Sequence, residues 1–158
     1  MSLVETIEGI VERGEGELLQ QVVDALHDEV EHYSWVGVYL VDGDDLVLGP
    51  WRGPQATEHV RIPVGQGVCG AAAASGETEI VDDVNADPRY LACFPSTRSE
   101  IVVPIARNGH VVGEIDIDSD RRAAFTEEDR NALERIALLI SPHCPSSTRN
   151  PSRLRSLP

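Results

Sequence analysis

Residues 100–119 read EIVVPIARNGHVVGEIDIDS, and this stretch is the clearest indication of the fold. Asn108-Gly109 is a strong β-hairpin signal, because both residues tolerate the positive φ angles of a two-residue turn. The flanking segments, residues 100–106 and 110–119, are rich in Val and Ile, which favour strands. We therefore predict two antiparallel strands joined by this turn.

The segments around this hairpin predict further strands and helices. The turn DGDD, residues 42–45, allows a second hairpin. The other predicted strands are 35–41, 45–51, 59–64 and 78–84. The predicted helices are 4–12, 17–32 ending near Tyr33, a short helix within 65–76 that ends at Gly76, and a final helix capped by Thr126, with Asp129 at the capping-box position. Since no alternating βαβ pattern or GxGxxG motif occurs, we predict an α+β fold with helices packed on a central antiparallel sheet.

Length and composition indicate one domain. A chain of 158 residues fits a single domain that buries a hydrophobic core. We place this domain at residues 1–140. Residues 141–158 are rich in Ser, Pro and Arg, and such a segment cannot build a core, so we predict that this tail is disordered.

The chain is strongly acidic. It has 27 acidic residues against 13 basic ones, all of them Arg, and a net charge of −14. Such a surface repels nucleic acid and anionic membranes. Molar salt shortens the screening length to about 3 Å and removes most of the self-repulsion, so we predict a salt-rich, halophilic cytoplasm. An ordinary acidic protein is the alternative.

The N-terminus and the cysteines indicate the compartment. The first residues, MSLVETIEGIVERGEGE, lack the basic start and the apolar stretch of a signal peptide. No apolar run approaches the roughly 18 residues that span a bilayer. An odd number of cysteines, 3, argues against structural disulfides. We therefore predict a cytoplasmic protein without membrane contact.

Cys93 and Cys69 are the candidates for redox chemistry. Cys93 lies in a polar loop before a strand, where Arg89 and Arg98 could lower its pKa and favour the reactive thiolate. Cys69 lies in a tight GVCG loop. Two such thiols could form a reversible disulfide, but each could equally be an inert, partly buried residue, and their spacing does not decide between these alternatives.

Acidic and aromatic side chains form a candidate binding site. Glu100 begins an apolar strand, where burial would raise its pKa and make it a proton donor; it could also be an exposed strand-edge residue. Asp116 and Asp118 alternate with isoleucines, so both carboxylates share one sheet face, which is either solvated or a binding site. Trp35 and Tyr39 share one face of another strand, either as core residues or as an aromatic wall for a small apolar group.

The sequence indicates neither a metal nor a cofactor. The 5 histidines show no ligand spacing. No CxxC, P-loop or GxSxG motif occurs. We therefore predict no metal ligands and no cofactor.

Taken together, these segments resemble a known family. The chain is similar to free methionine-(R)-sulfoxide reductases, which are built on a GAF domain. The similarity covers most of residues 15–140 and rests on the combination of GVCG, an AC dipeptide before STRSE, and DIDS. It implies an antiparallel sheet flanked by helices, a homodimer, and reduction of the free amino acid rather than of methionine sulfoxide within proteins. A non-catalytic GAF module that senses a small ligand or redox state is the alternative.

The resemblance also implies a role for each candidate residue. Cys93 matches the catalytic nucleophile, which would become a sulfenic acid, and Cys69 matches a cysteine that forms a disulfide with it. A thioredoxin-like dithiol would recycle this disulfide. Where family members often carry a further cysteine, this chain has His59, so Cys69 is the aligned resolving candidate; Cys144 could reach the site only if the tail folds back. The residues that match the substrate site are Trp35 and Tyr39, for the methyl pocket, and the acids Glu100, Asp116 and Asp118.

Overall fold

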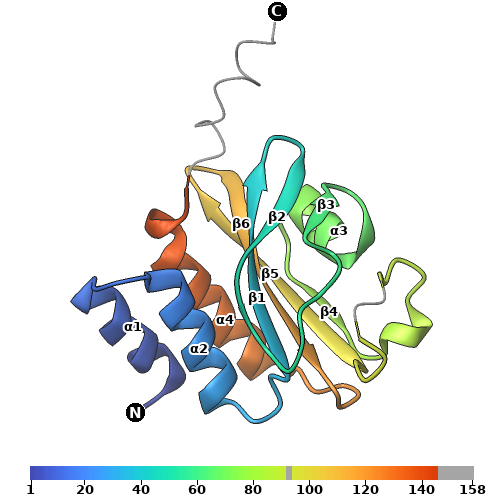
Figure 1. Ribbon diagram of the computed structural model, residues 1–158, viewed down its shortest axis with the longest axis horizontal. Helices are drawn as coiled ribbons and strands as arrows, with labels where there is room; N and C mark the ends of the chain where they lie inside the picture. The colour runs from blue at the N-terminus through green and yellow to red at the C-terminus, as the bar shows by residue number, and fades with distance from the viewer. Residues whose placement is uncertain (92–93, 146–158) are drawn as a thin grey trace, which may run out of the picture.

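The computed structural model describes residues 1–91 and 94–145 of the chain. Within these residues, the helices are α1 (Leu3–Arg13), α2 (Leu18–Glu29), α3 (Gly67–Ser75) and α4 (Glu127–Ile140) (Figure 1). The strands are β1 (Trp35–Asp42), β2 (Asp45–Arg52), β3 (Arg61–Pro63), β4 (Glu79–Val81), β5 (Ser99–Arg107) and β6 (His110–Ser119). Two short 3₁₀ turns, η1 and η2, cover Val84–Ala86 and Ser141–His143.

One antiparallel sheet contains the strands of the described region, in the order β3-β2-β1-β6-β5-β4. The predicted hairpin between β5 and β6 is confirmed: Asn108 and Gly109 have φ angles of 54° and 79°, as its two-residue turn requires. β6 lies between β1 and β5, with Ile115 opposite Val38 on one side and Val103 on the other. The predicted α+β class with a central antiparallel sheet is therefore confirmed.

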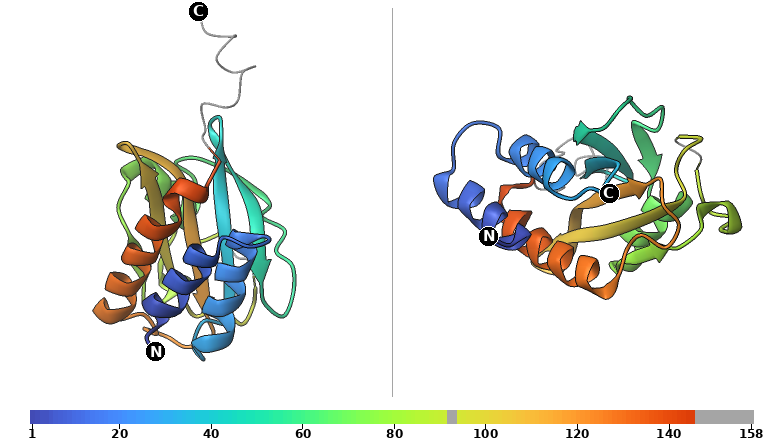
Figure 2. Two further views of the ribbon diagram at one scale, coloured as in Figure 1. Left: turned by 90° about the vertical axis from the view of Figure 1, so that its left-hand side faces the viewer. Right: turned by 90° about the horizontal axis from the view of Figure 1, so that it is seen from below.

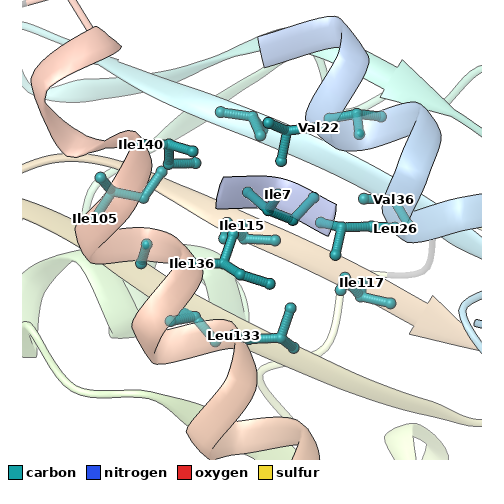
Figure 3. Packing of buried hydrophobic residues seen from close by; sticks show 14 of the residues in the cluster. Ile7, Val22, Leu26, Val36, Ile105, Ile115, Ile117, Leu133, Ile136 and Ile140 are labelled. Carbon is teal, nitrogen blue, oxygen red and sulfur yellow. The ribbon is translucent and has the colours of Figure 1, made fainter. Parts of the chain in front are cut away.

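The main hydrophobic core lies between one face of the sheet and helices α1, α2 and α4, which Figure 2 shows together on that face. Alternate residues of the central strands, such as Ile115 and Ile117 on β6, point into this core. Each fully buried Ile or Leu side chain contributes roughly 1.5–3 kcal/mol. Figure 3 shows the centre of the core, with Ile7, Val22, Leu26, Val36, Ile105, Ile115, Ile117, Leu133, Ile136 and Ile140.

The opposite face of the sheet is covered by α3, which packs against β3, β5 and β6 (Figure 2). A second cluster of buried side chains lies on this face and includes Leu46, Ile62, Val68 and Val102. Because side chains alternate between the two faces of a strand, the residues between the core isoleucines of β6 point to this side. These intervening residues are acidic, and the candidate site is built around them.

The predicted helix ends are confirmed except at α2. Thr126 caps α4 and forms a capping box with Asp129, and Gly76 ends α3 with a φ angle of 73°. Helix α2 ends at Glu29, earlier than predicted. The chain leaves the helix there because Tyr33 is buried and its hydroxyl donates a hydrogen bond to Asp129 Oδ1 at 2.7 Å. In the part of the chain that the structure describes, no helix is long and apolar enough to cross a membrane.

The start of the predicted tail is ordered, which corrects the expected boundary after residue 140. Residues 141–143 form η2, and Cys144 is buried against the main core. The Arg107 guanidinium holds this segment by donating hydrogen bonds to the carbonyl oxygens of Ser141 and Cys144, each at 2.8 Å. Composition alone missed this anchor because its donor lies on β5. The rest of the predicted tail, residues 146–158, lies outside the described residues.

Candidate active site

Buried acidic residues line the face of β6 that α3 covers. Glu114, Asp116 and Asp118 occupy alternate positions on this strand and are 0%, 3% and 2% exposed. Glu100 lies opposite Asp118 on β5 and is 4% exposed. The acids therefore do not form a solvated face, and Glu100 is not an exposed strand-edge residue. This burial places a cluster of carboxyl groups on the face of the sheet that α3 covers, shielded from solvent.

The aromatic candidates lie directly beside these acids. On β1, Trp35 is the register partner of Asp118, and Tyr39 is the partner of Glu114. Directly opposed residues of antiparallel strands have Cβ atoms about 4.5–5.5 Å apart, so their side chains are neighbours on one face. The prediction that Trp35 and Tyr39 share a face is confirmed, and that face is the acidic one.

The Trp35 indole is held in a fixed position. It stacks on Trp51 with ring centroids 6.2 Å apart and contacts Phe94 at 5.8 Å. Its Nε1 donates a hydrogen bond to the Gln55 carbonyl oxygen at 3.2 Å. A Cβ atom added at Gly53 would collide with the indole ring. The position of the indole ring therefore depends on the absence of a side chain at Gly53.

We expect Gly53→Ala to displace the Trp35 indole and to weaken any ligand that contacts it. The added methyl group meets ring atoms that cannot move without breaking the stack on Trp51. The expected result is a shifted tryptophan emission spectrum and a loss of about 1–3 kcal/mol in the free energy of unfolding, as for other overpacked sites. The matched control is Gly9→Ala in α1, where a Cβ meets only the end of the Arg13 side chain. An unchanged emission spectrum for Gly53→Ala would contradict the expected displacement.

A small cavity lies on this face, between Tyr39 and the acids Glu100 and Asp116. Its volume is about 10 Å³, and its lining is formed by Tyr39, His59, Ile62, Val68, Cys69, Leu91, Glu100 and Asp116. The Tyr39 hydroxyl donates a hydrogen bond of 2.6 Å to the His59 carbonyl oxygen, which closes one wall. A volume of this size holds about one water molecule. An amino acid can therefore enter only when lining side chains move apart.

Cys69 brings a thiol into this cavity from α3. The sequence predicted a loop at this position, but Cys69 lies in the first turn of the helix. Its side chain is buried and free of any disulfide, and Sγ lies 3.9 Å from Glu100 Oε2. Burial, followed by the negative charges of Asp116 and the other acids, raises the pKa of the Cys69 thiol well above its ordinary value. Cys69 is therefore a protonated, weakly nucleophilic thiol at neutral pH.

Several carboxylate oxygens of these acids lack a hydrogen-bond partner among the described residues. Among the described residues, both carboxylate oxygens of Glu114, Asp116 Oδ1 and Asp118 Oδ1 have no hydrogen-bond partner. Thr97 donates a hydrogen bond to the other oxygen, Asp118 Oδ2, at 3.4 Å. Burial raises the pKa of Asp116, and burial together with the charge of Asp116 raises the pKa of Glu114 and Asp118. Such a cluster favours a bound cation or protons.

Glu114 is the member of this cluster that sequence reasoning missed. The signal was available, because Glu114 continues the alternation of Asp116 and Asp118 on the same strand. It is fully buried, with Tyr39 and Pro104 as its register partners.

We expect Glu114→Gln to stabilise the protein more at pH 8 than at pH 5. In the window between the unfolded pKa of about 4.3 and the raised folded pKa, the folded state keeps a proton that the unfolded state has lost, so stability falls as pH rises. The Glu114→Gln variant has no such loss, so its free energy of unfolding at pH 8 should exceed that of the parent by at least about 1 kcal/mol. A difference of this size requires a rise of less than one unit in the pKa of Glu114 on folding. Urea unfolding at both pH values tests this, with the exposed Glu12→Gln as the control. Equal stability of variant and parent at pH 8 would show that folding does not raise the pKa of Glu114.

Cys93, the predicted nucleophile, lies outside the described residues. The described residues on either side of residues 92–93 both belong to the site: Leu91 lines the cavity, and Phe94 contacts Trp35. Arg89 was predicted to lower the pKa of Cys93. Its guanidinium already forms ion pairs with Asp87 at 2.8 Å and Glu79 at 3.0 Å, which restricts this role.

Comparison with known proteins identifies the family. A model of the GAF domain matches residues 15–142. The structure of the type II free methionine-R-sulfoxide reductase from Thermoplasma acidophilum is 40% identical, with a TM-score of 0.77 over 89% of this chain and 94% of that one. The chain belongs to the free methionine-R-sulfoxide reductase family of GAF domains. The resemblance predicted from the GVCG and DIDS segments is thereby confirmed.

Other relatives of this GAF domain agree. The free methionine-R-sulfoxide reductase of Neisseria meningitidis, in complex with its substrate, gives a TM-score of 0.81 at 37% identity over 96% of this chain and 89% of that one. The free methionine-R-sulfoxide reductase of Escherichia coli is 40% identical over 111 residues, 70% of this chain. The match spans 66% of the E. coli protein, slightly less than two thirds of its length.

Proposed function

We propose that this protein reduces free methionine R-sulfoxide to methionine. The observation that carries the proposal is the row of buried acids with unpaired oxygens, directly beside Trp35 and Tyr39, in a chain that is 40% identical to a named reductase. The proposed substrate combines an ammonium group, a polar sulfoxide and a small methyl group. Its ammonium matches the acids and its methyl group matches the aromatic side chains.

The acids select the free amino acid. Asp116 holds the substrate ammonium by charge-assisted hydrogen bonds, which use the oxygen that otherwise has no partner among the described residues. A methionine sulfoxide within a peptide has no ammonium group and would leave this buried carboxylate unsatisfied. Trp35 and Tyr39 contact the methyl group on the other side. Together these contacts orient the sulfoxide toward Glu100.

The reaction transfers oxygen from the substrate to a cysteine. Glu100, in its protonated form, donates a hydrogen bond to the sulfoxide oxygen, and Asp118 assists. Cys93 attacks the substrate sulfur and forms a transient S–S bond. This bond and the S–O bond of the sulfoxide then break as the oxygen passes to the Cys93 sulfur, so methionine leaves and Cys93 becomes a sulfenic acid. The raised pKa of Cys69 supports Cys93 rather than Cys69 as the first nucleophile.

Cys69 completes the cycle. Its thiol condenses with the Cys93 sulfenic acid, which forms a disulfide and releases water. A thioredoxin-like dithiol then reduces this disulfide by two electrons and restores both thiols. His59 lines the same cavity but carries no sulfur, so it cannot take this role.

Turnover of the two sulfoxide epimers tests the proposed function. The reduced protein is incubated with dithiothreitol and the R or the S epimer of free methionine sulfoxide, and methionine is quantified. We expect consumption of the R epimer alone. The control substrate, N-acetylmethionine R-sulfoxide, lacks the ammonium and should not react. Binding of the R epimer without turnover would instead favour a non-catalytic sensing module.

We propose further that the protein is a cytoplasmic homodimer in a salt-rich cell. Its net charge of −14, carried without any lysine, supports the salt-rich interior, since screening at molar salt removes the self-repulsion. Cytoplasmic thioredoxin-like proteins would supply the reductant, and the family resemblance supports the dimer.

We expect the melting temperature to rise when potassium chloride is increased from low to molar concentration. A gain of about 2 kcal/mol corresponds to roughly 4–8 °C for a domain of this size. A matched variant with the exposed residues Glu12, Glu15 and Glu77 changed to Lys should gain less, because it carries less net negative charge. A melting temperature that does not change across the salt series would refute the adaptation to salt.

A further inference from the structure

Three potential metal ligands meet at the cavity. The sulfur of Cys69 and one carboxylate oxygen each of Glu100 and Asp116 all lie within 4.8 Å of one another, and all these residues are buried. They come from α3, β5 and β6, so no spacing in the sequence could reveal them. The sequence accordingly predicted no metal ligands.

One distance between these ligand atoms is close to that in a zinc site. Typical Zn–S and Zn–O bonds of about 2.3 and 2.0–2.2 Å in a tetrahedron place sulfur and oxygen roughly 3.5 Å apart. The Cys69 Sγ to Glu100 Oε2 distance is 3.9 Å, so side-chain movements of a few tenths of an ångström close the site on this side. A thiolate with carboxylates suits Zn²⁺ better than Mg²⁺ or Ca²⁺, which prefer oxygen ligands alone.

A second observation, an unpartnered and buried carboxylate oxygen, favours a cation at this site. Asp116 is 97% buried and lines the cavity, and its Oδ1 has no hydrogen-bond partner among the described residues. Glu114 and Asp118 lie on the same face of β6 and also have oxygens without a hydrogen-bond partner among the described residues. The cavity of about 10 Å³ has room for an ion or a water molecule with only small side-chain movements, whereas an amino acid needs it to open.

We propose that the reduced protein binds one Zn²⁺ ion through Cys69 Sγ, Glu100 and Asp116. Three protein ligands leave the fourth position of the tetrahedron to a water molecule, as in other zinc sites with three protein ligands. Binding displaces the proton of the Cys69 thiol into solvent. Since the proposed function uses the same three residues for substrate binding and catalysis, zinc then acts as a competitive inhibitor; this consequence, unlike the binding, rests on that function.

Cobalt and zinc titrations of the reduced full chain test the site. Co²⁺ is added in an anaerobic cuvette, and thiolate coordination is followed by its near-ultraviolet charge-transfer absorption. We expect one Co²⁺ per chain, displacement by one Zn²⁺, and no displacement by excess Mg²⁺. Cys69→Ser should abolish the absorption, and Asp116→Asn should weaken zinc at least about 10-fold, since even outer-shell changes cost 10–100-fold.

A further cysteine variant makes the test specific. Cys144→Ser should keep the cobalt absorption and the zinc affinity, because Cys144 is buried in the main core. Loss of the absorption in Cys144→Ser, or its retention in Cys69→Ser, would overturn the assignment. Zinc binding without sulfoxide reduction would overturn the proposed function alone, and sulfoxide reduction without zinc binding would overturn this inference alone.

Discussion

A Cys93→Ser variant is expected to lose reduction of free methionine R-sulfoxide by at least about 10³-fold, because a serine hydroxyl does not ionise near neutral pH and is a far weaker nucleophile than a thiolate. The measurement is methionine released per chain with dithiothreitol as reductant. Substrate affinity, measured by calorimetry, should change little, because the ammonium and methyl contacts come from other residues.

Cys144→Ser is the matched control for this loss. Cys144 is buried against the core helices, and burial raises its pKa to about 11, so its thiol is inert. The control should keep its turnover even where its melting temperature falls. Substantial turnover by Cys93→Ser would refute the assignment of Cys93 as nucleophile.

A Cys69→Ser variant is expected to release about one methionine per chain and then to stop when thioredoxin is the sole reductant. The first step needs only Cys93, but the sulfenic acid then has no partner thiol in the cavity. Rapid-quench measurement of methionine should show a burst of one equivalent without a steady phase. Mass spectrometry after trapping with a 1,3-diketone should find the adduct on Cys93.

A small thiol separates the chemical step from the resolving step. Dithiothreitol reaches the sulfenic acid directly, so the same Cys69→Ser variant should turn over repeatedly with this reductant. Multiple turnovers with thioredoxin alone would count against Cys69 as the resolving residue. A missing burst would instead indicate that the buried thiol, 3.9 Å from Glu100, supports the first step.

Local interactions explain why so much of the fold could be predicted. The Asn108-Gly109 turn, the Thr126–Asp129 capping box and the stop of α3 at Gly76 each depend on residues within one turn of each other. The end of α2 was misjudged because Tyr33 is held by Asp129, 96 residues away.

The candidate site was predicted only in part for the same reason. Alternation along β6 placed Asp116 and Asp118 on one face, and it applied equally to Glu114. The alternation could not show whether that face is exposed to solvent or buried, because the element that covers it is α3. The order of residues 141–145 likewise depends on Arg107, which is distant in the sequence.

The sequence by itself determined the strands, the turns and the family, because these depend on neighbouring residues and on recognisable segments. Tertiary structure alone decided that the acids are buried, that Cys69 lies beside Glu100, and that Trp35 rests against Gly53. The physical reason is that burial and pKa shifts arise from atoms that folding brings together from distant parts of the chain, and no local pattern contains that information.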